Sequence, residues 1–305
     1  MLNPILAFSA TRRMRSFKTL LVVGAYLVVM MGVTLLIMGR IFGSEVTIYG
    51  IRRSVTCYQA LMVAQFGLIV LIAPAMTSGA IAGERERQTL ELLLVTNTRS
   101  FRIVTGKAME SFAMLALLIV CGFPVMCLTM VAGAVTLLQI LVGELFLLLM
   151  AFAAVCVGVL ASALARSTVA STIISYLILF AIGGITLLPV FSDFPDSVTE
   201  IVYDSAKLAA LAPGSALRMI PSLLLCNPGY ALVALLHGQT GLFSGIMEYR
   251  GYGRILCEFK LMDKAGGETI ALISCGVILA AGILLLAAAA FTLRRNSLKP
   301  AKRTK

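Results

Sequence analysis

Six long stretches without a charged residue most strongly constrain what this chain can fold into. Each is long enough for a helix of about 20 residues that crosses a bilayer. A water-soluble domain does not contain several such runs, because an apolar helix of that length has no face to show to water. The chain is therefore predicted to be an all-α integral membrane protein with six transmembrane helices, over residues 19–39, 54–83, 111–143, 145–165, 167–192 and 269–293.

Composition supports the membrane class, and the uncharged runs divide the chain into parts. Of 305 residues, 60% are hydrophobic and only 13% are charged, whereas soluble domains carry about 25% charged residues. The turn-prone sequence GAVT at residues 133–136 is expected to end the third helix. The predicted parts are an amphipathic interfacial helix at 1–18, spans one to five within 19–190, an exofacial segment at 191–268, the sixth span at 269–293 and a basic tail at 294–305.

The positive charge of the chain is distributed unequally between the two sides of the predicted membrane. With the N-terminus inside, the inner segments hold 16 of the 25 lysines and arginines and four acidic residues, while the outer segments hold nine basic and ten acidic residues. This asymmetry follows the positive-inside rule and needs no nucleic-acid partner. Both termini are expected in the cytosol of a bacterial cell with the chain in the plasma membrane, where the basic tail meets anionic lipids.

The exofacial segment leaves two alternatives open. Residues 219–247 carry no charge if His237 is neutral, but prolines and glycines interrupt them, which favours amphipathic or re-entrant helices. A seventh span is the competing interpretation, and it would place the basic tail outside. Residues 255–262 give a weak strand signal. Cys226 and Cys257 could form an exofacial disulfide, which the sequence does not establish.

Several kinds of active chemistry have no signature in the chain. The phosphate-binding pattern G-x-x-x-x-G-K-[ST] does not occur, and the sole histidine has no second histidine to share a metal. Glu110 and Glu144 are expected near span ends at an aqueous boundary, which leaves the span centres without ionisable residues. We therefore expect no catalytic residue, no metal and no cofactor on this chain, and an energy source in another protein.

The segment GERERQTLELLL at residues 83–94 concentrates charge directly after the second span. Glu84 to Arg87 alternate acid and base, and Leu90, Leu93 and Leu94 form an apolar stripe at helical spacing. The pattern predicts a short helix at the inner face, with Glu84 and Gln88 aligned one turn apart. A solvated interfacial helix would need only positive charge, so apolar anchors beside mixed charges favour docking into a protein groove.

This segment resembles the first cytoplasmic loop of permease subunits of type-two ATP-binding cassette (ABC) exporters. The family pattern of Glu, a short spacer, Thr, x, Glu, x, Leu and a later Gly-Lys is carried by Glu84, Glu86, Thr89, Glu91, Leu93, Gly106 and Lys107. The resemblance extends to NPIL at 3–6, to LASALARSTVASTIISY at 160–176 and to NPGYALVALL at 227–236. Many members have Gly where this chain has Gln88, and Ser/Thr-Pro where it has Asn97 and Thr98.

The resemblance implies a permease subunit that pairs with a second permease, either the same or a sibling chain, and with two cytosolic ATPase subunits that bind ATP and Mg. Residues 84–107 would be the coupling loop, with the coupling helix at 84–95, and Pro74 would bend the second span. The implied docking residues are Glu84, Arg85, Glu86, Arg87, Thr89, Leu90, Glu91, Leu93 and Leu94.

The cargo is not encoded in a recognisable motif. Spans with few polar side chains favour an amphiphilic or lipid-like substrate or an antimicrobial peptide. A non-transporting membrane subunit that senses or extracts an outer-leaflet ligand is the second interpretation. An intramembrane enzyme is the third, and the missing catalytic groups disfavour it.

Overall fold

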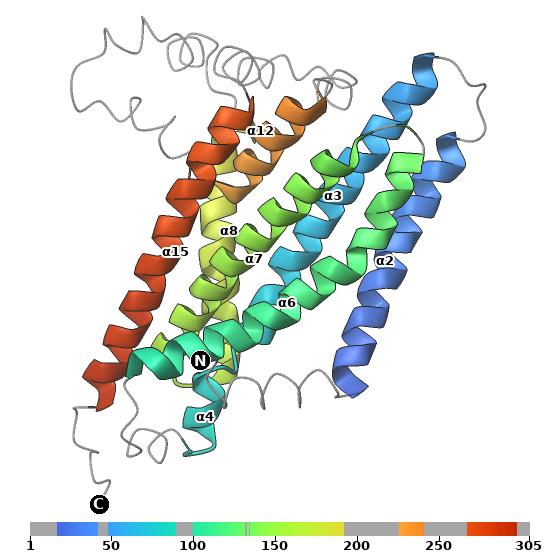
Figure 1. The fold of residues 1–305 in the computed structure, drawn as a ribbon. Coiled ribbons are helices and arrows are strands. Elements are labelled where there is room, and N and C mark those ends of the chain that lie inside the picture. Colours follow the sequence, from blue (N-terminus) through green and yellow to red (C-terminus); the bar gives the residue numbers. More distant parts are fainter. Residues whose placement is uncertain are drawn as a thin grey trace, which may run out of the picture.

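A computed structural model describes residues 17–41, 48–89, 100–131, 133, 135–191, 226–240 and 267–297, and Figure 1 shows their helices side by side. These residues form helices and short turns without a strand, which confirms the prediction of an all-α membrane protein for this part of the chain. The helices, in chain order, are α2 (Phe17–Ile41), α3 (Ile48–Thr77), α4 (Ala82–Glu86), α6 (Ser100–Val131), α7 (Leu137–Leu164), α8 (Thr168–Phe191), α12 (Pro228–Thr240) and α15 (Gly267–Ser297).

Five segments of the described chain are long and apolar enough to cross a membrane. They lie in α2, in α3 with its continuation into α4, in α6, in α7 and in α15. The fifth predicted span corresponds to α8, whose described apolar stretch, Thr168–Gly183, is shorter. Five of the six predicted spans thus have the required length in the structure, and the crossing by α8 stays a prediction.

The connection between α6 and α7 contains the predicted break. α6 ends at Val131, and Gly133 has a φ of 72°, a left-handed conformation that glycine adopts without strain. The hydroxyl of Thr136 then accepts a hydrogen bond from the backbone N–H of Gln139, whose side chain accepts one from the N–H of Thr136. This reciprocal capping starts α7 at Leu137.

This early start of α7 overturns one expectation about the acidic residues. Glu144 lies seven residues inside the helix and is only 6% exposed, so it is not at an aqueous boundary. Glu110 likewise lies inside α6, because that helix begins at Ser100, and it is also buried. The runs between charges misplaced both helix starts, because α6 begins at Ser100, before the run 111–143, and α7 begins at Leu137, before the run 145–165.

α7 forms the centre of the bundle. It packs against α3, α6, α8 and α15, and a larger part of it is buried than of any other candidate span among the described residues. Gly158 of α7 meets Thr77 of α3, where a methyl group on the glycine would lie 2.7 Å from the Cβ of Thr77. The two helices therefore approach too closely at this point for any larger residue.

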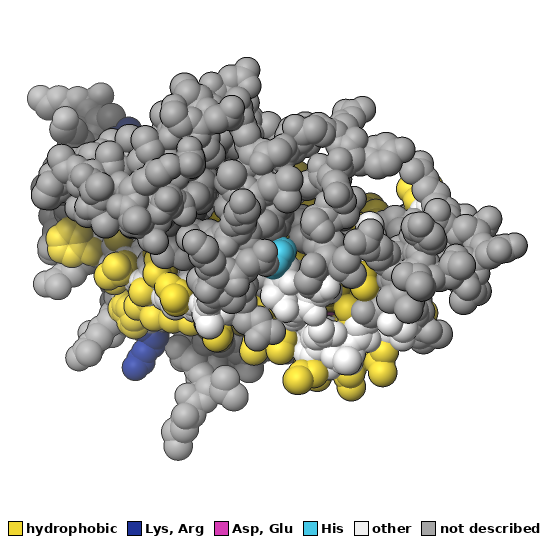
Figure 2. Space-filling view, turned by 90° about the horizontal axis from the view of Figure 1, so that it is seen from above, with side chains coloured by type: hydrophobic (Ala, Val, Ile, Leu, Met, Phe, Trp, Pro, Cys, Tyr) yellow, Lys and Arg dark blue, Asp and Glu magenta, His cyan; other side chains and the backbone are white. Residues whose placement is uncertain are grey.

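The outer faces of the peripheral helices are apolar. Large hydrophobic side chains are exposed on α2 (Val28, Leu35), on α8 (Ile173, Phe180) and on α15 (Leu272). Viewed from the α12 end, many of the described side chains that reach the surface are hydrophobic (Figure 2). Such surfaces are expected where the bundle meets lipid or another membrane subunit.

α12 and α4 lie at opposite ends of the bundle (Figure 1). The side chain of Asn227 begins α12 by accepting a hydrogen bond from the N–H of Gly229 at 2.7 Å. The 13 residues of α12 rise only about 20 Å, which is short of the hydrocarbon core. The remainder of 219–247 lies outside the described residues, so the choice between a re-entrant helix and a seventh span stays a prediction. The strand signal at 255–262 falls outside the described residues.

Candidate functional site

The charged segment that the sequence singled out forms a compact connection, the α4 elbow (residues 78–89), at the end of α3. α3 continues through Pro74 and ends three residues later at Thr77. The carbonyl of Pro74 accepts a hydrogen bond from the N–H of Ser78 at 2.9 Å, so the helical hydrogen-bond pattern continues past the proline to the end of α3. The predicted bend at Pro74 stays a prediction. The similar Pro124 inside α6 was not singled out from the sequence.

Ser162 of α7 anchors the start of α4. Its Oγ accepts hydrogen bonds from the backbone N–H groups of Ile81 and Ala82, each at 2.9 Å, and donates to the carbonyl of Ser78 at 2.8 Å. The first N–H groups of a helix have no partner within it, and Ile81 provides no side-chain cap. Ser162 is fully buried and supplies the missing acceptor. Sequence reasoning did not identify this residue.

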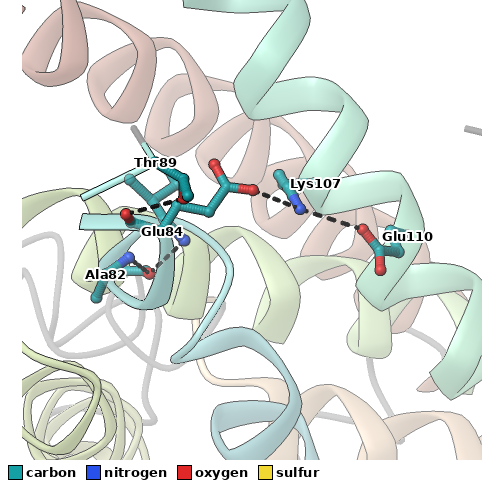
Figure 3. A network of polar contacts seen from close by, with 7 residues as sticks. Ala82, Glu84, Thr89, Lys107 and Glu110 are labelled. Carbon is teal, nitrogen blue, oxygen red and sulfur yellow. Dashed lines mark hydrogen bonds and ion pairs between the residues drawn. The ribbon is translucent and has the colours of Figure 1, made fainter. Parts of the chain in front are cut away.

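The partly buried side chain of Glu84 is directed toward α6. Its carboxylate pairs with Nζ of Lys107 at 2.8 Å, and Lys107 also lies 3.7 Å from the carboxylate of Glu110 (Figure 3). One lysine on α6 thus lies between an acid of the elbow and an acid of its own helix. The arrangement ties α4 to the first turns of α6.

Arg85 and Glu86 bind the two helix ends that meet beside the elbow. The guanidinium of Arg85 donates to the carbonyls of Ala163 and Ala165 at the end of α7. The carboxylate of Glu86 accepts the backbone N–H of Thr168 at 2.9 Å and its hydroxyl at 3.0 Å, at the start of α8. A cation at a helix C-terminus and an anion at an N-terminus both match the helix dipole.

The end of α4 shows how this chain accommodates Gln88 at a position where many family members have Gly. Gln88 has a φ of 58°, its N–H donates to the carbonyl of Arg85 at 3.1 Å, and the N–H of Thr89 donates to the carbonyl of Glu84 at 3.0 Å. These two bonds with a left-handed residue form a Schellman motif, in which glycine is usual at the position of Gln88. α4 therefore ends at Glu86, and the expected alignment of Glu84 with Gln88 on one helix face does not occur.

The predicted docking residues divide into three groups. Glu84, Arg85 and Glu86 contact their own chain, as described above, and Arg87 and Thr89 are exposed, as is Glu86. The remaining four lie outside the described residues: Leu90, Glu91, Leu93 and Leu94. The docking role stays a prediction for all of them. The internal contacts of the first three were not anticipated, because the partners of Arg85 and Glu86 lie about 80 positions away in sequence and the partner of Glu84 lies on α6.

A second polar cluster joins α12 to α3 and α7 at the other end of the bundle. The hydroxyl of Tyr58 donates to Oε1 of Gln239 at 2.9 Å. Gln139 and Gln239 each donate a side-chain N–H to the other's backbone carbonyl, at 2.7 and 3.1 Å. Gln59 donates to the hydroxyl of Thr240 at 2.7 Å. Glutamines inside otherwise apolar runs were the available signal for this cluster.

Two other predicted features have no test in the structure. Cys226 is exposed immediately before α12, but Cys257 lies outside the described residues, so the disulfide stays a prediction. Within the described ranges, no group of three or more histidine, cysteine, aspartate or glutamate side chains is placed to hold a metal ion.

Comparison with known protein families gives a match over most of the chain. The family model described as "ABC-2 family transporter protein" matches residues 54–291, which extend from the second turn of α3 well into α15. No curated protein matches the chain.

Proposed function

This chain belongs to the ABC-2 transporter family of membrane permeases, and on that premise we propose that it is the permease subunit of an exporter. The family implies an ATPase partner in an ABC transporter. We further propose that ATPase subunits, which bind ATP and Mg, dock at the α4 end and that a second permease, identical or related, completes the membrane part. The match across 54–291 is the observation that carries this proposal.

The contacts of the α4 elbow support a coupling role. The elbow is continuous with α3, and it is held to α6 through Glu84, to α7 through Arg85 and Ser162, and to α8 through Glu86. A force applied to the exposed residues Arg87 to Thr89 would therefore reach four helices. Rigid elements packed in this way transmit displacement as a unit.

The charge distribution supports the orientation. Arg85, Arg87, Arg102 and Lys107 lie at the α4 end, together with Arg166 between α7 and α8. The positive-inside rule places such an end in the cytosol. A cytosolic ATPase would then meet the exposed side of the elbow.

The proposed cargo is amphiphilic: a lipid-like molecule or a membrane-active peptide. The described interior of the bundle is mostly apolar, with small polar clusters at defined places. A hydrophilic ion would need a continuous polar path, whereas an amphiphile can keep its apolar part against such helices.

Reconstitution tests the proposal. The tagged chain is purified from native membranes with its ATPase, and both are placed in vesicles with a fluorescent lipid or a labelled cationic peptide. We expect ATP hydrolysis stimulated by the cargo and ATP-dependent movement of the label across the bilayer. Stimulated hydrolysis without movement would favour the non-transporting alternative, and movement by the chain without any ATPase would overturn the coupling proposal.

Arg87→Glu tests the docking surface separately. Arg87 is exposed on the elbow, so its charge reversal should reduce co-purification of the ATPase while leaving the helices folded. The matched control is Arg102→Glu, an exposed arginine at the same end on α6. Equal amounts of ATPase bound to the wild type and to Arg87→Glu would contradict docking at this position.

A further inference from the structure

Glu144 is an acidic side chain enclosed in the bundle without a cation. It lies on α7 about 10 Å from the beginning of that helix. Its Oε2 accepts a hydrogen bond from Nε2 of Gln65 on α3 at 3.1 Å. Among the described residues, no lysine, arginine or histidine forms an ion pair with it. A buried carboxylate with one neutral donor is poorly stabilised in its charged form.

Three oxygen atoms around this carboxyl lack hydrogen-bond partners. They are Oε1 of Glu144, Oε1 of Gln65 and the hydroxyl of Tyr26 on α2. All three side chains are more than nine-tenths buried. A carboxylate can only accept hydrogen bonds, whereas a carboxylic acid also donates one. A single added proton would therefore remove the charge and let the carboxyl donate to an oxygen that has no partner.

Two glycines permit close packing of the side chains near Glu144. A methyl group on Gly122 of α6 would lie 2.6 Å from the hydroxyl of Tyr26 and 3.1 Å from Nε2 of Gln65. A methyl group on Gly143 would lie 2.7 Å from Cε of Met62 and 2.9 Å from the hydroxyl of Tyr58. The two glycines thus let polar side chains approach the carboxyl closely.

We propose that Glu144 is a proton-binding site inside the bundle, held between α2, α3 and α7. The titratable groups that face it are Tyr26 and Tyr58, with the thiol of Cys121 on α6 beside Tyr26. None of these carries a positive charge that would favour the carboxylate. The neutral acid is favoured while the three helices stay packed, so separation of α2 or α3 from α7 would expose it to water and release the proton.

The polar cluster at α12 lies on one side of this site. Tyr58 faces Glu144 and donates to Gln239, and Gln139 precedes Glu144 by five residues, about 7 Å along α7. The cluster connects the carboxyl toward the α12 end of the bundle. The proton site requires neither an ATPase nor a cargo. It can therefore be tested independently of the proposed function.

Infrared spectroscopy of the purified chain tests the proposal. A difference spectrum between wild type and Glu144→Gln at pH 7 should show the carbonyl band of a protonated carboxylic acid, shifted in heavy water. Glu144→Gln keeps the size of the side chain and its contact with Gln65. The matched control is Glu110→Gln, which removes a buried glutamate that pairs with Lys107 and should remove no such band.

A protonated-acid band that is lost in Glu144→Gln and kept in Glu110→Gln supports the site. Removal of an ionised carboxylate band by Glu144→Gln at pH 7 overturns it. Labelling with dicyclohexylcarbodiimide, which modifies protonated carboxyls in apolar surroundings, should then identify Glu144 by mass spectrometry in the wild type only.

Discussion

The carboxylate of Glu86 accepts both the backbone N–H and the hydroxyl of Thr168, at 2.9 and 3.0 Å, although 82 positions separate them. This contact joins the α4 elbow to the first turn of α8. The elbow is therefore attached to a helix that neither precedes nor follows it directly in the chain. The relationship makes the mechanical connection of the elbow testable one contact at a time.

Removal of this contact should loosen the start of α8. Glu86→Ala deletes the acceptor for an N-terminal N–H, a loss that costs roughly 0.5–2 kcal/mol at helix starts. We expect faster hydrogen exchange at residues 168–172, measured by mass spectrometry. Arg87→Ala is the neighbouring control, since Arg87 is exposed, and it should leave this exchange unchanged. Identical protection in wild type and Glu86→Ala would show that the contact does not hold α8.

Ser162→Ala should weaken the junction of α4 with α7. The substitution leaves the N–H groups of Ile81 and Ala82 without their acceptor, at roughly 1–3 kcal/mol for each buried group. We expect a lower midpoint of thermal unfolding in detergent. Ser111→Ala is the matched control, because the Oγ of Ser111 is buried without a partner, and it should be nearly neutral. Equal midpoints for the two variants would contradict the anchoring role of Ser162.

Gln88→Gly should stabilise the elbow. A left-handed conformation costs a residue with a side chain about 1–2 kcal/mol, which glycine avoids. We expect slower hydrogen exchange at the amides of residues 85–89. Gln88→Val is the opposing variant, because a β-branched residue is the least compatible with a positive φ, and it should accelerate the exchange. The reverse order of the two variants would refute the Schellman assignment.

Gly158→Ala should disturb the contact between α3 and α7. The added methyl group would overlap the side chain of Thr77, and overpacking of this kind costs roughly 1–3 kcal/mol. Thermal unfolding and the yield of folded monomer measure the loss. Gly67→Ala on α3 is the control: no atom lies within 4 Å of its new methyl group, so helix propensity should raise stability by about 0.5–1 kcal/mol. A tolerated Gly158→Ala would disprove the close approach.

The sequence was sufficient for the features that depend on local composition. Uncharged runs predicted helices of membrane-spanning length, and GAVT predicted the break after Val131. The start of α7 was misplaced because the capping pair Thr136 and Gln139 begins the helix before the charge of Glu144 is reached. Charge spacing indicates where a helix can be desolvated, but capping hydrogen bonds decide where it begins.

The contacts of the elbow could not be predicted from the segment itself. The alternating charges of Glu84 to Arg87 suggested a surface for a partner, and three of those residues contact helix ends of the same chain. Arg85 and Glu86 match helix ends whose positions depend on tertiary packing. The sequence indicated that these charges need partners. Only the fold shows that the partners include Lys107, Ala163 and Thr168.

The burial of α7 has a consequence for how the molecule can change shape. From Phe146 to the end of the helix, neighbouring helices enclose nearly every side chain, while α2, α8 and α15 expose broad apolar faces. A peripheral helix can exchange one set of lipid tails for another at little cost, but α7 can shift only if all its neighbours repack. We therefore expect α7 to keep its position while the outer helices tilt relative to it when the molecule changes conformation.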